Sequence, residues 1–294
     1  MAEKKRLKTE REFLELYHSP IEPEDHRVDK LMPGVLKRFE QIHLGSIVPA
    51  DIKSGFPSLD SILNGFRNGQ FVVIEGKQSQ GKTALVFDIA RHVALRTRKT
   101  VAIFSAEMDR EQIVTRLVAA ESGTTLWRIC SGQVRKEGDF DKIEDAMKGI
   151  AATPIYVFGP SMDEMLTLYT IARELKEKNN LSLLIIDRAL WQPKTDIDEQ
   201  RKVAQGFKLM AEILEVPILV THTIIDSNNE DTSLSRFSDT RIRICQTDEP
   251  DIKEVVVVKN KYGVLGFMKL QLNSDAVSFH EIETGSKLKT SSNH

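Results

Sequence analysis

The sequence predicts an α/β fold in which a mostly parallel central sheet is flanked by helices. Strand-like and helix-like segments alternate through the middle of the chain, a pattern typical of parallel sheets with crossover helices. Leu181–Ile186 is apolar on both faces, as expected of a central strand covered from both sides. A turn with the spacing G-x-x-x-x-G-K-T, at Gly76–Thr83, lies between a strand-like run and a helix-like segment.

Length and composition indicate a protein with a full hydrophobic core. The chain has 294 residues, of which 40% are hydrophobic and 29% are charged, as in ordinary globular proteins. Its formal net charge is −2, so any contact with nucleic acid has to be local, for instance in the pore of a ring. Cys130 and Cys245 form neither a disulfide framework nor a metal cluster. The charged N-terminus does not resemble a signal peptide, and no run approaches the ~18 apolar residues of a membrane span, so we expect a cytoplasmic location.

Residues 1–46 are expected to form a charged tail and an amphipathic linker helix. The basic residues between Lys4 and Arg11 could contact phosphates, or the tail could simply be solvated. Residues 13–17 could form a short helix. Between Pro33 and Ile42, apolar residues recur on one helical face. Such a stripe needs a cover, so this helix is expected to fold back or to dock on a neighbouring subunit.

Residues 47–284 are expected to form one domain of alternating elements, followed by a disordered tail at 285–294. The expected strands are 71–76, 100–105, 154–158, 181–186, 217–220 and 241–245, the last at the edge of the sheet because arginine and isoleucine alternate in it. The expected helices are 57–63, one after the glycine turn, one capped by Asp109, 139–151, one after a capping box at Ser161 and Glu164, and 199–215. Residues 254–259 and 267–272 should pair as a hairpin, and 228–235 should be a loop.

The glycine turn is the strongest functional signal, because its residue types suit a triphosphate. Glycines let backbone N–H groups surround phosphate oxygens, and the N-terminus of the following helix adds its dipole. Lys82 can reach the β- and γ-phosphates, and the Thr83 hydroxyl can ligate Mg²⁺. The expected nucleotide-binding residues are Gly76, Lys77, Gln78, Ser79, Gln80, Gly81, Lys82, Thr83 and Ala84. The alternative is an ordinary glycine turn between strand and helix.

Two carboxylates follow buried strands, where open α/β sheets bind their ligands. Asp187 ends the run 181–186 and could hold Mg²⁺ together with Thr83; alternatively, it caps a helix or a turn after the strand. Glu107 follows the strand 100–105 and could orient or deprotonate the attacking water; alternatively, it is an exposed loop residue.

Five segments of the sequence form a recognisable set: Ser54–Leu59, Gly76–Thr83, Val101–Gln112, Ala119–Gly123 and Ser131–Gly132. Together they resemble one known family, the RecA-fold motor domain of DnaB-type replicative DNA helicases. The resemblance extends from about Pro33 to about Phe279, and the segment around Glu107 is its most specific part. It implies a RecA-like P-loop NTPase fold with a mostly parallel sheet and an antiparallel C-terminal hairpin.

The resemblance also implies roles for individual residues. Glu107 would be the catalytic base and Asp187 the metal aspartate, with ATP and Mg²⁺ as cofactors. The helix at 33–42 would be the linker helix that docks on the adjacent subunit of a hexamer. Lys259 and Lys261 lie where the family has Lys-x-Arg, the pair that reaches the γ-phosphate of the neighbouring subunit.

The chain departs from the family pattern at several positions. Lys261 replaces the finger arginine and lacks its planar fork. Thr223 replaces a glutamine that senses the γ-phosphate; His222 beside it could substitute or could be structural. The segment 224–239 is shorter than the family's and lacks the Arg-Glu-Gly stretch that grips single-stranded DNA. Arg236 and Lys194 are therefore the candidate nucleic-acid contacts. About thirty residues precede the linker helix, so the family's N-terminal, primase-contacting domain is expected to be absent.

Two functions are compatible with these features. The first is a DnaB-like ATPase that assembles as a ring and acts on single-stranded DNA in replication, with replication proteins as possible partners and no membrane contact. The second is an interaction protein derived from the helicase fold, in which ATP controls assembly and unwinding is weak or absent. A third hypothesis is a RecA-type recombination mediator, which should form filaments on DNA and not closed rings.

Overall fold

The computed structural model describes residues 27–44, 52–134, 138–160, 165–187, 197–224 and 233–282. The chain divides into two units, Met1–Asp51 and Ile52–His294. The sequence predictions for the tail, for the Ser161–Glu164 capping box and for residues 285–294 lie outside the described residues.

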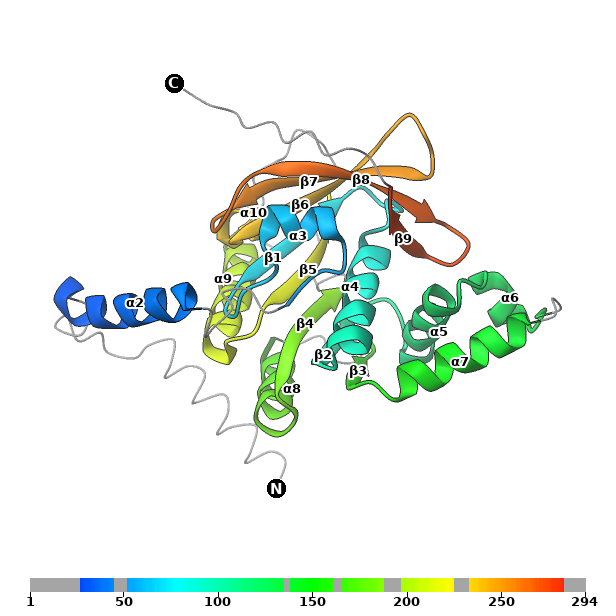
Figure 1. The fold of residues 1–294 in the computed structure, drawn as a ribbon, viewed down its shortest axis with the longest axis horizontal. Coiled ribbons are helices and arrows are strands. Elements are labelled where there is room, and N and C mark those ends of the chain that lie inside the picture. The colour runs from blue at the N-terminus through cyan, green and yellow to red at the C-terminus, as the bar shows by residue number, and fades with distance from the viewer. Residues whose placement is uncertain are drawn as a thin grey trace. The chain divides into compact units, whose positions relative to one another are not determined.

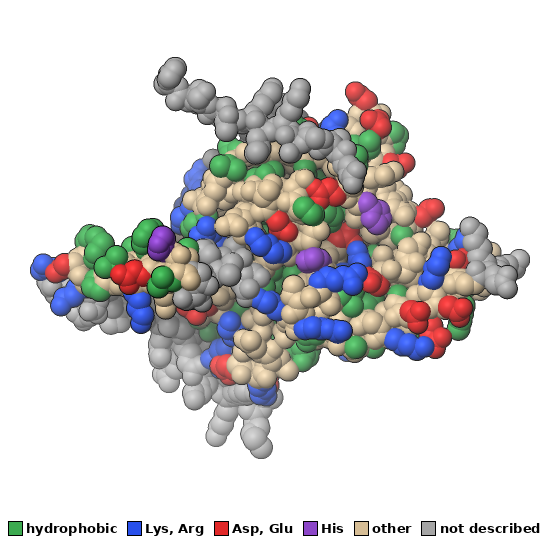
Figure 2. All heavy atoms as spheres, in the orientation of Figure 1, with side chains coloured by type: hydrophobic (Ala, Val, Ile, Leu, Met, Phe, Trp, Pro, Cys, Tyr) green, Lys and Arg blue, Asp and Glu red, His purple; other side chains and the backbone are tan. Residues whose placement is uncertain are grey.

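The described part of the first unit is one helix, α2 (Val28–His43). It contains the predicted amphipathic segment 33–42 and begins five residues earlier. Its apolar side chains are largely exposed, and Figure 2 shows several of them bare on the helix. The exposed set is Val28, Leu31, Met32, Val35, Leu36, Phe39 and Ile42. Within the described residues of this unit, no segment covers the stripe, so the need for a cover remains.

In the second unit, nine strands of the described residues form one sheet in the order β3-β2-β4-β5-β1-β6-β7-β8-β9 (Figure 1). The strands are β1 (Phe71–Gly76), β2 (Thr100–Ser105), β3 (Ile155–Phe158), β4 (Leu181–Asp187), β5 (Ile218–Thr223), β6 (Thr240–Gln246), β7 (Ile252–Asn260), β8 (Gly266–Asn273) and β9 (Ser278–Glu281). Strands β1 to β6 pair in parallel, and β6 to β9 pair antiparallel. The predicted mostly parallel sheet and the predicted hairpin, β7–β8, are therefore confirmed.

Helices cover both faces of this sheet. Successive side chains of a strand point to opposite faces, so a central strand such as β1 packs against helices on both sides. The helices of the second unit are α3 (Pro57–Leu63), α4 (Lys82–Thr97), α5 (Arg110–Ser122), α6 (Leu126–Ser131), α7 (Asp139–Ala151), α8 (Met165–Asn179), α9 (Ile197–Leu214) and α10 (Ser233–Phe237). Val72 and Ile74 of β1 join a core cluster with residues of α3, α4, α5 and α7. Phe71 points to the opposite face, where its ring contacts Phe207 of α9.

The prediction that residues 241–245 lie at the edge of the sheet is wrong. Strand β6 lies between β1 and β7. Its alternating pattern arises because Arg241 and Arg243 form ion pairs with Glu75, a buried residue of β1. Arginine in this strand therefore reflects a partner inside the sheet and not exposure to solvent.

Other differences are short elements that the sequence did not predict. Residues 233–235, expected to be in a loop, begin α10, where Leu234 is fully buried. Helix α6 and strand β9 were also unpredicted. Each is six residues or shorter, so packing against the rest of the unit decides its structure. No helix among the described residues is both long enough and apolar enough to cross a membrane.

Candidate nucleotide site

The glycine turn forms a loop between β1 and α4 whose backbone is shaped by two left-handed residues. Ser79 has φ +61° and Gly81 has φ +92°. A Cβ on Gly81 would lie 2.7 Å from the ring of Phe279 on β9, so packing and backbone conformation both require glycine there. Helix α4 begins directly after this residue, at Lys82. The loop therefore presents the N–H groups of a helix N-terminus, the feature that binds phosphate in proteins.

Lys82 lies inside this loop and its ammonium group contacts the loop backbone. Its Nζ donates to the carbonyl oxygens of Gly76, at 3.0 Å, and Lys77, at 2.7 Å. The side chain is buried, so a positive charge is held among backbone groups that an anion would approach. The arrangement suits a group with several negative oxygens.

Asp187 meets the phosphate loop at the carboxyl end of the sheet. The Thr83 hydroxyl donates to Asp187 Oδ1 at 3.0 Å, and the Thr221 hydroxyl donates to the same oxygen at 2.9 Å. Burial raises the pKa of Asp187, while the two threonine hydrogen bonds, Arg116 and Lys82 lower it. A buried carboxylate beside a threonine hydroxyl at a helix N-terminus is the ligand pair that P-loop proteins use for Mg²⁺. The sequence did not single out Thr221, although it lies at the end of a predicted strand.

Glu107 follows β2, the strand next to β4 in the sheet. Ser105 pairs with Asp187 in the register of these strands, and the Ala106 N–H donates to the Asp187 carbonyl at 3.2 Å. The Ser105 hydroxyl accepts the N–H of Glu107 at 3.4 Å. These hydrogen bonds fix the backbone of Glu107 at the same edge of the sheet as Asp187. The Glu107 side chain is exposed.

The two candidate sensors lie on β5 beside the start of the phosphate loop. His222 pairs with Glu75, and Thr223 pairs with Gly76. Burial, helped by the charge of Lys82, lowers the pKa of His222 to about 4, so its imidazole is neutral at neutral pH. The Thr223 hydroxyl is buried and has no hydrogen-bond partner within the described residues. A buried, unpaired hydroxyl next to an anion site is a candidate ligand for that anion.

A buried ion pair beside the loop was missed by sequence reasoning. Glu75 is 1% exposed, and Arg243 Nε donates to its carboxylate at 2.7 Å. Burying a carboxylate requires such a partner. The signal was a charged residue in an apolar run together with two arginines in a later strand, but their pairing depends on which strands are neighbours.

The candidate finger residues lie at the opposite end of β1. The Asp239 N–H donates to the carbonyl of Phe71, the first residue of β1, and the Lys261 N–H donates to the Asp239 carbonyl. Lys261 Nζ lies 3.4 Å from the Asp239 carboxylate, and Lys259 Nζ donates to the Arg236 carbonyl at 3.0 Å.

The structure thus separates the predicted site residues into two groups. The phosphate loop and Asp187 meet at the carboxyl end of β1, and Glu107 follows β2 at the same edge of the sheet. Lys259, Lys261 and Arg236 lie at the amino end of β1. Arg236 is exposed on α10. Lys194, the second candidate nucleic-acid contact, lies outside the described residues.

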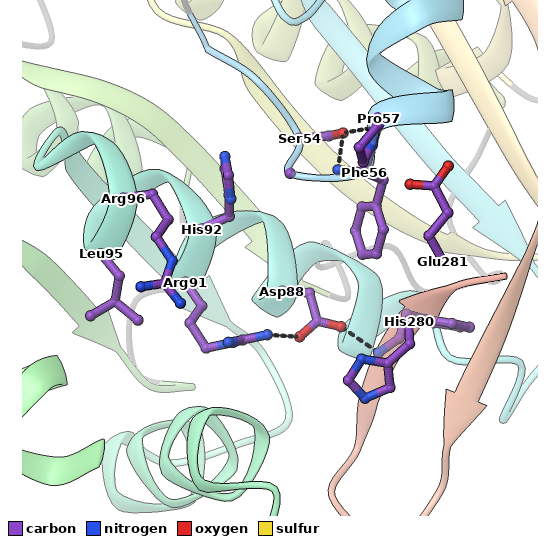
Figure 3. A pocket seen from close by; sticks show the side chains of 12 residues that line it. Ser54, Phe56, Pro57, Asp88, Arg91, His92, Leu95, Arg96, His280 and Glu281 are labelled. Atoms are coloured by element: carbon purple, nitrogen blue, oxygen red, sulfur yellow. Dashed lines mark hydrogen bonds and ion pairs between the residues drawn. The ribbon is translucent and has the colours of Figure 1, made fainter. Parts of the chain in front are cut away.

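A pocket of ≈ 260 Å³ lies alongside α4, lined by residues 54–57, the middle of α4 and β9 (Figure 3). Asp88 accepts the Phe279 N–H at 2.6 Å and pairs with Arg91 at 3.0 Å. Burial raises the pKa of Asp88 to about 6, against the lowering effect of Arg91. The Phe279 ring packs on Gly81. The hydrogen bond between Asp88 and the Phe279 N–H therefore holds β9 against α4 and supports the phosphate loop.

The described residues contain no cluster of three or more His, Cys, Asp or Glu side chains that could enclose a metal ion. Thr83 and Asp187 offer an incomplete set of oxygen ligands, which is what Mg²⁺ uses when phosphate oxygens and water complete its shell. The residues present therefore fit a magnesium-bound triphosphate.

Fold and loop together define the class of protein: an α/β P-loop NTPase of the RecA-like type, with its phosphate loop at the carboxyl ends of parallel strands. The family model for the DnaB-like helicase C terminal domain matches residues 51–231. This is more than half of the chain, and the chain belongs to that family.

The chain is similar to several replicative helicases. It is 25% identical over 258 residues to the replicative DNA helicase DnaB of Geobacillus stearothermophilus, covering 79% of this chain and 57% of that protein. It is 24% identical over 270 residues to the replicative DNA helicase DnaC of Bacillus subtilis (strain 168), covering 83% and 59%. The chain thus spans less than two thirds of the length of these curated relatives.

Solved structures share its fold. One of them, described as an ATPase domain, has a TM-score of 0.77 at 19% identity, covering 86% of this chain and 99% of that one. A DnaB-like replicative helicase, from a study of its interactions with primase, has a TM-score of 0.74 at 19% identity, covering 96% and 77%. At this identity the two structures establish the fold alone.

Proposed function

We propose that the protein binds and hydrolyses ATP as a DnaB-like ring ATPase that acts on single-stranded DNA in replication. The observation that carries this proposal is the convergence of Lys82, Thr83 and Asp187 at one end of β1. The loop residues Gly76 to Ala84 would bind the phosphates. Thr83 and Asp187 would hold Mg²⁺, which neutralises charge on the phosphoryl oxygens when bound.

Glu107 would act as the general base in hydrolysis. It is fixed next to the strand that carries Asp187, and it is exposed, so an attacking water can reach it. The Thr223 hydroxyl has no partner among the described residues. It is therefore a better candidate than the neutral His222 for the side chain that contacts the γ-phosphate. General-base catalysis of this kind contributes roughly 10²- to 10⁴-fold in rate.

Assembly into a hexameric ring would complete the site. Lys259 and Lys261 lie at the end of β1 opposite to the phosphate loop of their own chain, so they would serve a neighbour. The uncovered stripe of α2 would dock on an adjacent subunit, since a contiguous exposed apolar surface marks a protein contact. Arg236 and Lys194 would contact DNA in the ring.

ATP hydrolysis measured with and without single-stranded DNA at low salt tests this proposal. We expect turnover that rises with DNA, weakens as salt increases and disappears in Lys82→Ala, because phosphate contacts are salt-dependent. Turnover that is indifferent to DNA at low salt would contradict the proposed DNA role, and turnover that survives Lys82→Ala would contradict the proposed site.

A second candidate function is an assembly protein with little unwinding. The observation that favours it is that the Lys261 ammonium group is already paired with Asp239, which restrains a side chain needed at a neighbour's phosphate. This function requires strong nucleotide-dependent oligomerisation with background turnover and no DNA affinity. DNA unwinding by the purified protein would exclude it.

A further inference from the structure

The amino end of β1 carries a second charged site, built around the ring of Tyr262. This tyrosine lies at the tip of the β7–β8 hairpin. The Arg67 guanidinium lies 5.1 Å from the centre of its ring, and the Lys261 ammonium group lies 5.5 Å from the same centre. Two cations on one exposed ring make a positively charged, partly apolar projection.

The backbone holds this projection in place. The Tyr262 N–H donates to Asn260 Oδ1, and Asn260 Nδ2 donates to the Val264 carbonyl at 3.1 Å. The Arg67 N–H donates to Gln70 Oε1 at 2.8 Å, and the Gln70 N–H donates back to the Arg67 carbonyl. Both cations therefore project from turns whose backbone is ordered by hydrogen bonds.

Arg67 differs from Lys261 in having an unused donor. Lys261 is paired with Asp239. Arg67 Nε is buried and has no hydrogen-bond partner within the described residues. Its guanidinium is therefore placed by the Tyr262 ring and not by a hydrogen bond at Nε.

Arg67 cannot serve the phosphate loop of its own chain. It lies before Phe71, the start of β1, and the phosphate loop begins at Gly76, the end of the same strand. Five steps of about 3.3 Å place these two ends about 16 Å apart, farther than an arginine side chain extends.

The phosphate site of each chain would combine several negative charges when a triphosphate is bound. A magnesium-bound triphosphate remains anionic, and Asp187 and Glu107 add carboxylates beside it. Lys82 and Arg116 are the cations that act on Asp187 among the described residues. The site therefore has room for cations supplied from outside the chain.

We infer that Arg67, stacked on Tyr262 beside Lys261, contacts the triphosphate bound to a neighbouring copy of this chain and supplies the planar guanidinium that the lysine pair lacks. The inference rests on the proposed ATP-binding ring. A guanidinium donates two parallel hydrogen bonds to phosphate oxygens, whereas an ammonium group acts as a point charge. Arg67 thus completes the site in trans from a loop that is distant in sequence from Lys259 and Lys261.

Subunit mixing tests the inference through hydrolysis. Arg67→Ala and Lys82→Ala are each expected to lose at least about tenfold in ATP turnover. When the two variants are mixed without nucleotide and then assembled, about one interface in four pairs an intact phosphate loop with an intact Arg67 in a closed ring. Turnover of the mixture should therefore exceed that of either variant alone. Arg173→Ala is the matched control, because Arg173 also stacks on a tyrosine, Tyr169, on α8.

Nucleotide-dependent assembly gives a readout that does not depend on hydrolysis. Mass measurement with a non-hydrolysable ATP analogue should show that Arg67→Ala needs about tenfold more analogue to assemble than Arg173→Ala, with Arg67→Lys in between. The inference is overturned if Arg67→Ala matches Arg173→Ala in assembly. It is also overturned if the wild type hydrolyses ATP but the mixture of the two variants does not exceed either variant alone. A third contradicting result is that Arg67→Ala and Arg67→Lys lose only single-stranded DNA binding. If the wild type hydrolyses no ATP, the proposed hydrolysis fails while the assembly measurement still decides the role of Arg67.

Discussion

The two ends of β1 differ in how they are built. At the carboxyl end, a strand, a loop and a helix that are consecutive in the sequence form the phosphate site, and Asp187 joins from a strand two positions away. At the amino end, Asp239 contacts Phe71, Lys208 and Lys261, which come from three segments that are distant in sequence. In the proposed function, the first end receives an anion and the second presents cations to a neighbour. A chain with these two unlike ends is suited to head-to-tail association, the geometry that closes rings.

The largest expected effect is on catalysis at the carboxyl end. Glu107→Gln should lower ATP turnover by roughly 10²- to 10⁴-fold, because it removes the proposed general base. Binding of a non-hydrolysable analogue should be unchanged. The control is Glu111→Gln, an exposed glutamate on the first turn of α5. Equal turnover in the two variants would remove Glu107 from the mechanism.

The next effect is on stability at the amino end. Asp239 is 3% exposed and accepts hydrogen bonds from the Phe71 N–H, at 2.9 Å, and from Lys208, at 2.6 Å. Asp239→Ala should lower the free energy of unfolding by about 3 kcal/mol, because it leaves buried donors without a partner. Glu212→Ala removes another partner of Lys208. Because the Glu212 side chain is 55% exposed, this change should cost below about 0.5 kcal/mol. Urea denaturation of both variants measures the difference, and similar values would show that the Asp239 cluster is not stabilising.

A smaller effect separates metal binding from folding. Asp187→Asn should weaken apparent Mg²⁺ affinity by about 10- to 100-fold in the presence of a nucleotide analogue. It should not lower the melting temperature, because burial already raises the pKa of this carboxyl and the amide carries no charge to desolvate. Isothermal titration at varied Mg²⁺ concentration measures the affinity. An unchanged Mg²⁺ dependence would place the metal elsewhere.

The smallest effect is a pH dependence of stability at the carboxyl end. The folded-state pKa of His222 is lowered from 6.5 to about 4, so protonation favours the unfolded chain. The stability that neutral His222 contributes is present above pH 6.5 and is lost as pH falls towards 4. His222→Gln should therefore flatten the decline across this range, measured by urea denaturation. An equally steep decline in His222→Gln would contradict the assignment.

Asp88 gives the opposite dependence and so serves as a check. Its folded-state pKa is raised from 3.8 to about 6, so its contribution is present below pH 3.8 and is lost as pH rises through 6. Asp88→Asn should remove this loss. If both variants change the profile in the same direction, the burial of one of these groups differs from that described.

The sequence predicted the turn and the strands at the carboxyl end because their geometry is local. The spacing of Gly76 and Gly81 sets a turn, and a buried run ending at Asp187 places a carboxylate at the carboxyl edge of any parallel sheet. The pairing of Thr221 with Asp187 and of Arg243 with Glu75 was not predictable, because the first depends on β5 lying beside β4 and the second on β6 lying beside β1.

The amino end was hidden from sequence reasoning for a similar reason. Arg67 reads as a loop cation, and only the fold brings it to Tyr262, which is distant in sequence. The alternation of arginine and isoleucine in residues 241–245 is typical of an edge strand, and the prediction failed because a buried glutamate in β1 accepts the arginines. The pattern of polar and apolar residues indicates which side chains share a face of a strand. It does not identify the strand or helix that packs against that face.

The account depends most on binding of a magnesium triphosphate to the loop at residues 76–84. Isothermal titration of a non-hydrolysable ATP analogue, with Mg²⁺ and then with chelator, tests it most directly. Lys142→Ala, an exposed lysine on α7, is the control for loss of charge. The account predicts Mg²⁺-dependent binding that is retained in Lys142→Ala and lost in Lys82→Ala, and equal binding by the two variants would contradict it.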